Sequence, residues 1–152
     1  METIEFDELE ALSQALENPA SGTLGEILER VARTATRKLD TQAPDVFPFM
    51  ERMKMLLQRI PGDKHSGPRV DAMLSALMYS YFKGPSAKDL DFGAQAVALA
   101  RRTGDPLLRK ALSFHGVINA DMGNVARAIE CYAVPQACDN LQIVSAPITP
   151  LP

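Results

Sequence analysis

The chain has few of the features that mark secreted, membrane or metal-binding proteins. Its two cysteines, Cys131 and Cys138, are too few for a disulfide framework and lack the paired spacing of a zinc site. No apolar run is long enough to span a bilayer. Residues 1–17 contain six acids and neither Lys nor Arg, the reverse of a targeting segment. We therefore expect a cytoplasmic protein with no membrane partner.

Concentrated positive charge is also missing. The net charge is −3, whereas proteins that bind nucleic acid usually gather a basic face that neutralises phosphates. One basic group recurs at helical spacing, but acidic residues interleave with it, and we interpret it as a solvated helix face. Its members are Arg30, Arg33, Arg37 and Lys38. Nucleic acid is therefore not an expected partner.

Motifs for catalysis and for cofactors are missing as well. The chain contains no HExxH pair, no P-loop and no GxGxxG turn. Ser113, His115 and Asp121 are the residue types of a hydrolytic triad, but these positions point in different directions around one helix. We expect His115 to fill a crowded helix interface instead. The sequence therefore predicts a protein that is not an enzyme and that holds no cofactor or metal.

Helical periodicity, by contrast, covers most of the chain. Apolar residues recur three and four positions apart in segments that end at Pro, Gly or Asn. These predicted helices are 7–17, 24–39, 45–60, 69–83, 86–102, 106–122 and 124–134. Asp7 is a good N-cap, and capping boxes are expected at Thr23 with Glu26 and at Ser86 with Asp89. The fold class is therefore all-α.

Methionines lie along two of the predicted helices. An adaptable binding surface is one interpretation, because thioethers reshape around varied apolar partners. Met50, Met53, Met73 and Met78 occupy the core-facing phase of their helices, whereas Met55 does not. Core filling is therefore the favoured interpretation.

Pairing of the predicted helices gives the main architectural signal. After the first short helix they form hairpins at 24–60, 69–102 and 106–134, with a period of about 40 residues, as in helical-hairpin solenoids. An irregular helical bundle is the alternative. We expect a helical repeat domain at 1–134 and an irregular proline-rich tail at 135–152, where a weak apolar stretch at 141–144 is the only strand candidate.

The segment ALSFHGVINADMGNVARAIECYA contains small residues at particular spacings. Gly116 follows Leu112 by four residues, Gly123 lies at the turn, and Ala128 and Tyr132 follow. This order resembles the tetratricopeptide repeat. In that family the first glycine lets antiparallel helices approach closely, the second makes the turn, and the alanine lies where the next helix crosses.

The preceding hairpin resembles the family less closely. Met73 takes the large apolar position, Leu77 the usually small one, and Ala96 the later small one. Asn119 and Pro135 depart from the family pattern in the last hairpin. The resemblance covers 69–134 and extends to 24–60 only by helix length and pairing. It implies a right-handed solenoid of about seven helices in antiparallel hairpins.

A binding surface follows from the resemblance. The first helix of each hairpin would line a concave face that holds a protein or peptide partner. The residues expected there are Lys110, Ser113, Phe114, Val117 and Asp121, with Asp71, Leu74, Ser75, Met78 and Phe82. Ordinary packing against neighbouring helices or water is the alternative for all of them.

The expected function is a non-enzymatic protein–protein interaction module. The stretch AVALARRTGDPLL resembles the junction between repeats in bacterial regulators, which implies a sensory or scaffolding part of a bacterial signalling protein. A small cytoplasmic chaperone or adaptor and an oligomeric structural protein are the alternatives. The sequence shows no polar-faced helix that would cover the exposed end of the last hairpin, so three arrangements are possible. In the first, the tail folds over this end. In the others, two chains pair through it as a homo-oligomer, or a longer protein continues beyond it.

Overall fold

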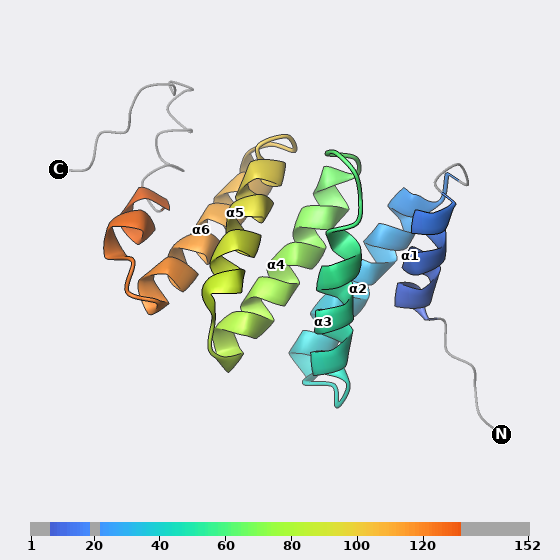
Figure 1. Cartoon of the computed structure of the whole chain (residues 1–152), viewed down its shortest axis with the longest axis horizontal. Helices are drawn as coiled ribbons and strands as arrows, with labels where there is room; N and C mark the ends of the chain where they lie inside the picture. Colours follow the sequence, from blue (N-terminus) through green and yellow to red (C-terminus); the bar gives the residue numbers. More distant parts are fainter. Residues whose placement is uncertain (1–6, 19–21, 132–152) are drawn as a thin grey trace. The chain divides into compact units, whose positions relative to one another are not determined.

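The computed structural model describes residues 7–18 and 22–131, which are helical apart from their connecting turns (Figure 1). The helices are α1 (Glu8–Glu17), α2 (Leu24–Thr41), α3 (Val46–Leu57), α4 (Ser66–Lys83), α5 (Ala87–Ala100) and α6 (Asp105–Asp121). Residues 125–131 are also helical, and no strand occurs within the described part. The predicted all-α class is confirmed. The expected tail at 135–152, with its strand candidate, lies outside the described residues.

The chain divides into two compact units, Met1–Ala76 and Leu77–Pro152, and the division falls within α4. In the first unit, α1 packs against α2 and α3, which also pack against each other. Its most deeply buried large side chains are Leu12, Leu28, Val31, Met50, Met53, Leu57 and Val70. In the second unit, α5 packs along α6. Its core includes Leu77, Phe92, Ala96, Ala111, Leu112 and Ile118.

Capping residues begin two of the helices as the sequence predicts. Asp7 accepts hydrogen bonds from two first-turn amides of α1, each at 3.0 Å. The carboxylate of Asp89 accepts the amide hydrogen bond of Ser86 at 2.8 Å, within the predicted capping box of α5. Thr23 differs, because its side chain makes no capping hydrogen bond to α2. Its ψ of 0° is not the extended conformation that directs a hydroxyl toward first-turn amides, so the prediction of a capping box there was wrong.

Methionine burial follows the phase of each helix. Met50, Met53 and Met73 are buried, and Met78 is half-buried. Met55 is 69% exposed on α3, as its position away from the core-facing phase predicts. Core filling is therefore confirmed as the main role of these residues.

The turns on either side of α3 place non-glycine residues in the left-handed region of the backbone. Gln42 has φ 53° at the end of α2, and His65 has φ 55° just before α4. The imidazole of His65 lies over α2, where a Cβ added to Gly25 would be 3.0 Å from Nδ1. The absence of a side chain at Gly25 therefore allows this loop to lie close to α2.

Arg69 organises the loop that joins α3 to α4. It is buried near the start of α4, and its Nη1 donates to the carbonyl oxygens of Gly62 at 2.9 Å and Lys64 at 3.1 Å. Nη2 donates to the carbonyl oxygen of Ile60 at 3.4 Å. One planar guanidinium thus holds three carbonyl oxygens of a loop that forms no regular structure. Burial lowers the pKa of Arg69.

The glycine that brings two helices together in the second unit is Gly93 on α5. A Cβ added there would lie 2.6 Å from Nδ1 of His115 on α6. Gly116, which the family resemblance assigns to close helix approach, is also buried on α6. The role predicted for Gly116 stays a prediction, and the sequence did not single out Gly93.

Candidate functional site

The predicted binding residues of α6 share one face of that helix. Lys110, Ser113 and Asp121 are exposed, whereas Phe114 and Val117 are half-buried. Their spacing of three and four residues places them in one row. The structure thus gives α6 an accessible stripe with an apolar middle and a charge near each end.

The predicted binding residues of α4 are less uniform. Asp71, Leu74 and Ser75 belong to the first unit, and Met78 and Phe82 belong to the second. Leu74 is only 2% exposed, so its side chain is enclosed in the core. The hydroxyl oxygen of Ser75 lies 3.2 Å from that of a threonine on α2. Phe82, in contrast, is 71% exposed.

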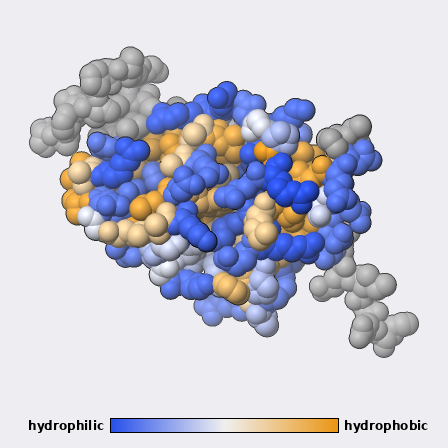
Figure 2. Space-filling view, in the orientation of Figure 1, coloured by the Kyte–Doolittle hydropathy of each residue, from blue (hydrophilic) through white to orange (hydrophobic). Residues whose placement is uncertain are grey.

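An exposed aromatic pair ends α4. The ring centroids of Tyr81 and Phe82 are 5.7 Å apart, with planes tilted by 54°. Tyr81 is 39% exposed. Figure 2 shows hydrophilic residues interrupting the hydrophobic ones over the face that it draws. Aromatic groups of this kind are enriched in the buried centres of protein interfaces.

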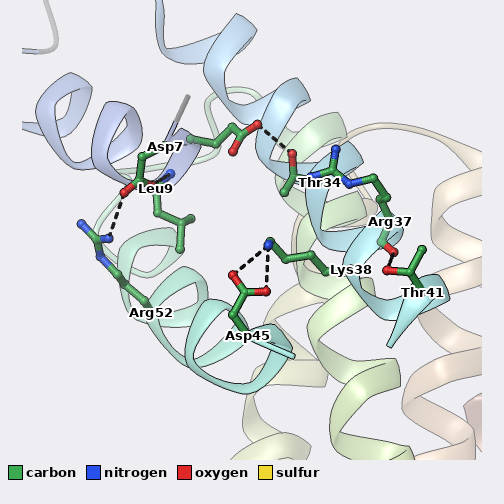
Figure 3. A network of polar contacts seen from close by, with 9 residues as sticks. Asp7, Leu9, Thr34, Arg37, Lys38, Thr41, Asp45 and Arg52 are labelled. Atoms are coloured by element: carbon green, nitrogen blue, oxygen red, sulfur yellow. Dashed lines mark hydrogen bonds and ion pairs between the residues drawn. The ribbon is translucent and has the colours of Figure 1, made fainter. Parts of the chain in front are cut away.

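A polar cleft lies between α1, α2 and α3, in the first unit, with a volume of about 560 Å³ (Figure 3). Each of the three helices contributes charged side chains, and α1 and α3 add apolar ones. The cleft is lined by Asp7, Glu8, Leu9, Thr34, Arg37, Lys38, Asp45, Pro48, Phe49 and Arg52. None of these residues was predicted to form a site.

The ion pair between Lys38 and Asp45 lies within this cleft. Lys38 Nζ donates to Asp45 Oδ1 at 2.9 Å and to Oδ2 at 2.8 Å, and it lies 5.3 Å from the ring centroid of Phe49. The hydrogen bond from Lys38 lowers the pKa of Asp45. The turn between α2 and α3 brings the two residues together, although seven positions separate them.

Three further polar contacts connect α1 and its N-cap to the neighbouring helices. Arg52 on α3 reaches Glu10 Oε1 at 3.3 Å and Asp7 Oδ2 at 3.9 Å, so both contacts are long. The hydroxyl of buried Thr34 donates to Glu8 Oε2 at 2.9 Å. The short first helix is thus held by polar contacts as well as by its apolar face.

Arg37 differs from the other cations of the cleft. It is exposed on α2 and lies beside Thr34 (Figure 3). Among the residues that the structure describes, no acid forms an ion pair with its guanidinium. The sequence had assigned Arg37 and Lys38 to a solvated helix face. The structure places both of them in a cleft.

A second, smaller pocket of about 140 Å³ lies in the second unit. It is lined by Ala94, Val97, Arg101, Leu112, His115, Arg127, Glu130 and Cys131. His115 is 5% exposed, and its Nδ1 has no hydrogen-bond partner among the described residues. Burial, together with nearby Arg127, lowers the pKa of His115. Burial also raises the pKa of the Cys131 thiol, which disfavours the reactive thiolate.

The residue types of a hydrolytic triad do not converge on this pocket. His115 is buried, whereas Ser113 and Asp121 are exposed on another face of α6. In the described part of the chain, no three His, Cys, Asp or Glu side chains gather closely enough to hold a metal ion. None of the helices searched there is sufficiently long and apolar to cross a membrane.

Comparison with known proteins identifies no relative. No protein-family model matches the chain, and neither the curated proteins nor the solved structures give a match. Function is therefore inferred from the residues themselves.

Proposed function

We propose that this protein is a non-enzymatic interaction module that buries a segment of a protein partner against the exposed faces of α4 and α6. The observation that carries the proposal is the exposure of Phe82, at 71%, beside the tilted ring of Tyr81. Burying a side chain of this size yields about 1.5–3 kcal/mol, so a partner that covers it gains binding energy. Lys110 and Asp121 on α6 would then orient the partner by charge.

The arrangement that suits this role is a solenoid of antiparallel hairpins like the tetratricopeptide repeat. The observed helices have bounds close to those that the apolar spacing predicted, and the 40-residue period was read from those helices, which supports the proposal. In a bacterial signalling protein of the cytoplasm, such a stack would act as a sensory or scaffolding part. The assignment to a bacterial signalling protein depends on the resemblance of the segment AVALARRTGDPLL to the junction between repeats in bacterial regulators.

Affinity capture with matched variants tests the proposal. Phe82→Ser removes the exposed ring of the second unit, and Met55→Ser removes a side chain of similar exposure, 69%, from α3. A defined partner should be captured by the wild type and by Met55→Ser, and lost with Phe82→Ser. A double substitution of Lys110 and Phe114 to Ser should also abolish capture. Equal capture by all of these proteins would contradict the proposal.

Self-association is a second candidate, because the helix at 125–131 carries an exposed apolar pair. Val125 and Ile129 lie one turn apart and are 60% and 52% exposed. A second copy of the chain could bury them through the C-terminal hairpin. Light scattering over a range of concentrations should then show a dimer that Ile129→Ser dissociates. A wild type that stays monomeric at all concentrations would exclude this candidate.

A further inference from the structure

The cleft between α1, α2 and α3 has acids and bases in similar number, but the acids have more hydrogen-bond and ion-pair partners than the bases. Asp7 caps α1, Glu8 accepts a hydrogen bond from Thr34, and Asp45 holds Lys38 with both oxygens. Each lining carboxylate therefore already has a donor. A cation entering the cleft would have to displace one of these contacts.

The bases of the cleft are different. Lys38 is held by Asp45, and Arg52 shares two carboxylates at the long distances of 3.3 and 3.9 Å. Arg37 is the one lining base that forms no ion pair with a described acid, although its charge, after the hydrogen bond from Lys38, also lowers the pKa of Asp45. Its planar guanidinium can donate two parallel hydrogen bonds, a geometry that matches a carboxylate.

We propose that this cleft binds an acidic peptide segment by one carboxylate, which the guanidinium of Arg37 holds. An apolar side chain beside that carboxylate would cover Pro48, which is exposed, and Phe49, which is half-buried. The cleft volume of about 560 Å³ accommodates a few residues of such a segment.

The surrounding acids define the selectivity of the site. Asp7, Glu8 and Asp45 lie around the same cleft, so a ligand with several negative charges meets repulsion. A single carboxylate next to an apolar residue meets the guanidinium of Arg37, which no described acid pairs, and the side chains of Pro48 and Phe49. The site therefore prefers one acidic side chain over a run of acids.

Nuclear magnetic resonance titration of the full chain, labelled with ¹⁵N, tests the proposal. The probe is the blocked peptide acetyl-Leu-Glu-Phe-amide, and its neutral twin carries Gln in place of Glu. The acidic peptide should give saturable shifts at the amides that surround the cleft. The neutral twin should bind about tenfold more weakly, since it cannot form the charge-assisted pair. Equal binding of the two peptides, or no binding of either, would overturn the proposal.

Two charge-matched variants complete the experiment. Arg37→Gln should weaken binding of the acidic peptide about tenfold. Arg33→Gln, an exposed residue on α2 that does not line the cleft, should leave binding unchanged. An equal loss with both variants would indicate long-range charge and would overturn the assignment to Arg37. The cleft lies in the first unit, so this outcome is independent of partner capture through Phe82 in the second.

Discussion

Gly93 on α5 and His115 on α6 are in such close approach that a Cβ at position 93 would lie 2.6 Å from Nδ1 of the imidazole. Real Cβ atoms essentially never come so close to another heavy atom. The imidazole is itself buried, which restricts its freedom to move aside. The packing of these two helices therefore depends on the missing side chain of Gly93.

Gly93→Ala is expected to destabilise the protein by about 1–3 kcal/mol through overpacking. Urea unfolding followed by circular dichroism would measure this. The double variant Gly93→Ala with His115→Ala removes the clash and should lose less stability than the two single variants added together. Strict additivity would show that the two residues do not interact.

Other glycines provide a graded control for this prediction. A Cβ at Gly67, on α4, would meet nothing within 4 Å, so Gly67→Ala should be neutral or stabilising by up to about 1 kcal/mol. A Cβ at Gly25 would meet the exposed His65 at 3.0 Å, and that ring can move. Among these three alanine substitutions, the loss of stability should therefore be largest for Gly93→Ala.

His115 should make stability depend on pH. Burial, with Arg127 nearby, lowers the pKa of this histidine below its ordinary value near 6.5. Above that value the side chain is neutral in both the folded and the unfolded chain, so the histidine does not lower the free energy of unfolding. As pH falls below it, the unfolded chain binds a proton before the folded chain does, so stability declines toward the lower folded-state pKa.

Unfolding measured at a series of pH values would check this behaviour. His115→Gln should reduce the decline between pH 6.5 and the onset of carboxylate titration. Identical pH profiles for the wild type and His115→Gln would contradict the prediction.

Replacing Arg69 should loosen the loop between α3 and α4. Arg69→Met keeps the apolar stem but removes hydrogen bonds to three carbonyl oxygens, at Ile60, Gly62 and Lys64. We expect a loss of about 2 kcal/mol in unfolding free energy. The exposed neighbour Arg59 serves as a control, since Arg59→Met should have little effect. An unchanged urea midpoint for Arg69→Met would mean that burying the charge costs as much as its contacts contribute.

Cys131 should react slowly with thiol reagents while the protein is folded. Its side chain is buried, and burial raises the pKa of the thiol, so both access and thiolate content are reduced. Alkylation by iodoacetamide in a Cys138→Ser background would measure the rate. Urea should accelerate the reaction strongly, because unfolding exposes the thiol. Equal rates with and without urea would contradict the burial of Cys131.

Lys38→Met should raise the pKa of Asp45 toward its ordinary value of 3.8, because the hydrogen bond from Lys38 is the largest cause of its lowering. Carboxyl titration followed by NMR would measure the shift. The change in stability should be small, since the Asp45 side chain is 59% exposed and water screens the pair. A pKa that does not move would show that the pair is not formed in solution.

The helices could be predicted closely from the sequence because their signals are local. Apolar spacing, the cap at Asp7 and the capping box at Ser86 all act within a few residues of the chain. Thr23 shows the limit of this approach. A capping sequence was present there, but the observed backbone at Thr23 does not direct its hydroxyl toward the helix.

The sites were less predictable because they combine distant segments. The cleft joins Arg37 with Asp45 and Arg52 from separate elements, and no single helix pattern contains that combination. The predicted faces of α4 and α6 contain residues as different as Leu74, which is enclosed, and Phe82, which is exposed. Helical phase gives the direction of a side chain, whereas accessibility depends on which neighbour covers it.

The left-handed residues Gln42 and His65 have a consequence for laboratory evolution of this protein. For a residue with a side chain, that backbone conformation costs roughly 1–2 kcal/mol, whereas glycine and asparagine adopt it readily. Libraries of random variants selected for heat resistance are therefore expected to become enriched in glycine or asparagine at these two positions. Such gains would arise in the loops and leave both cores untouched.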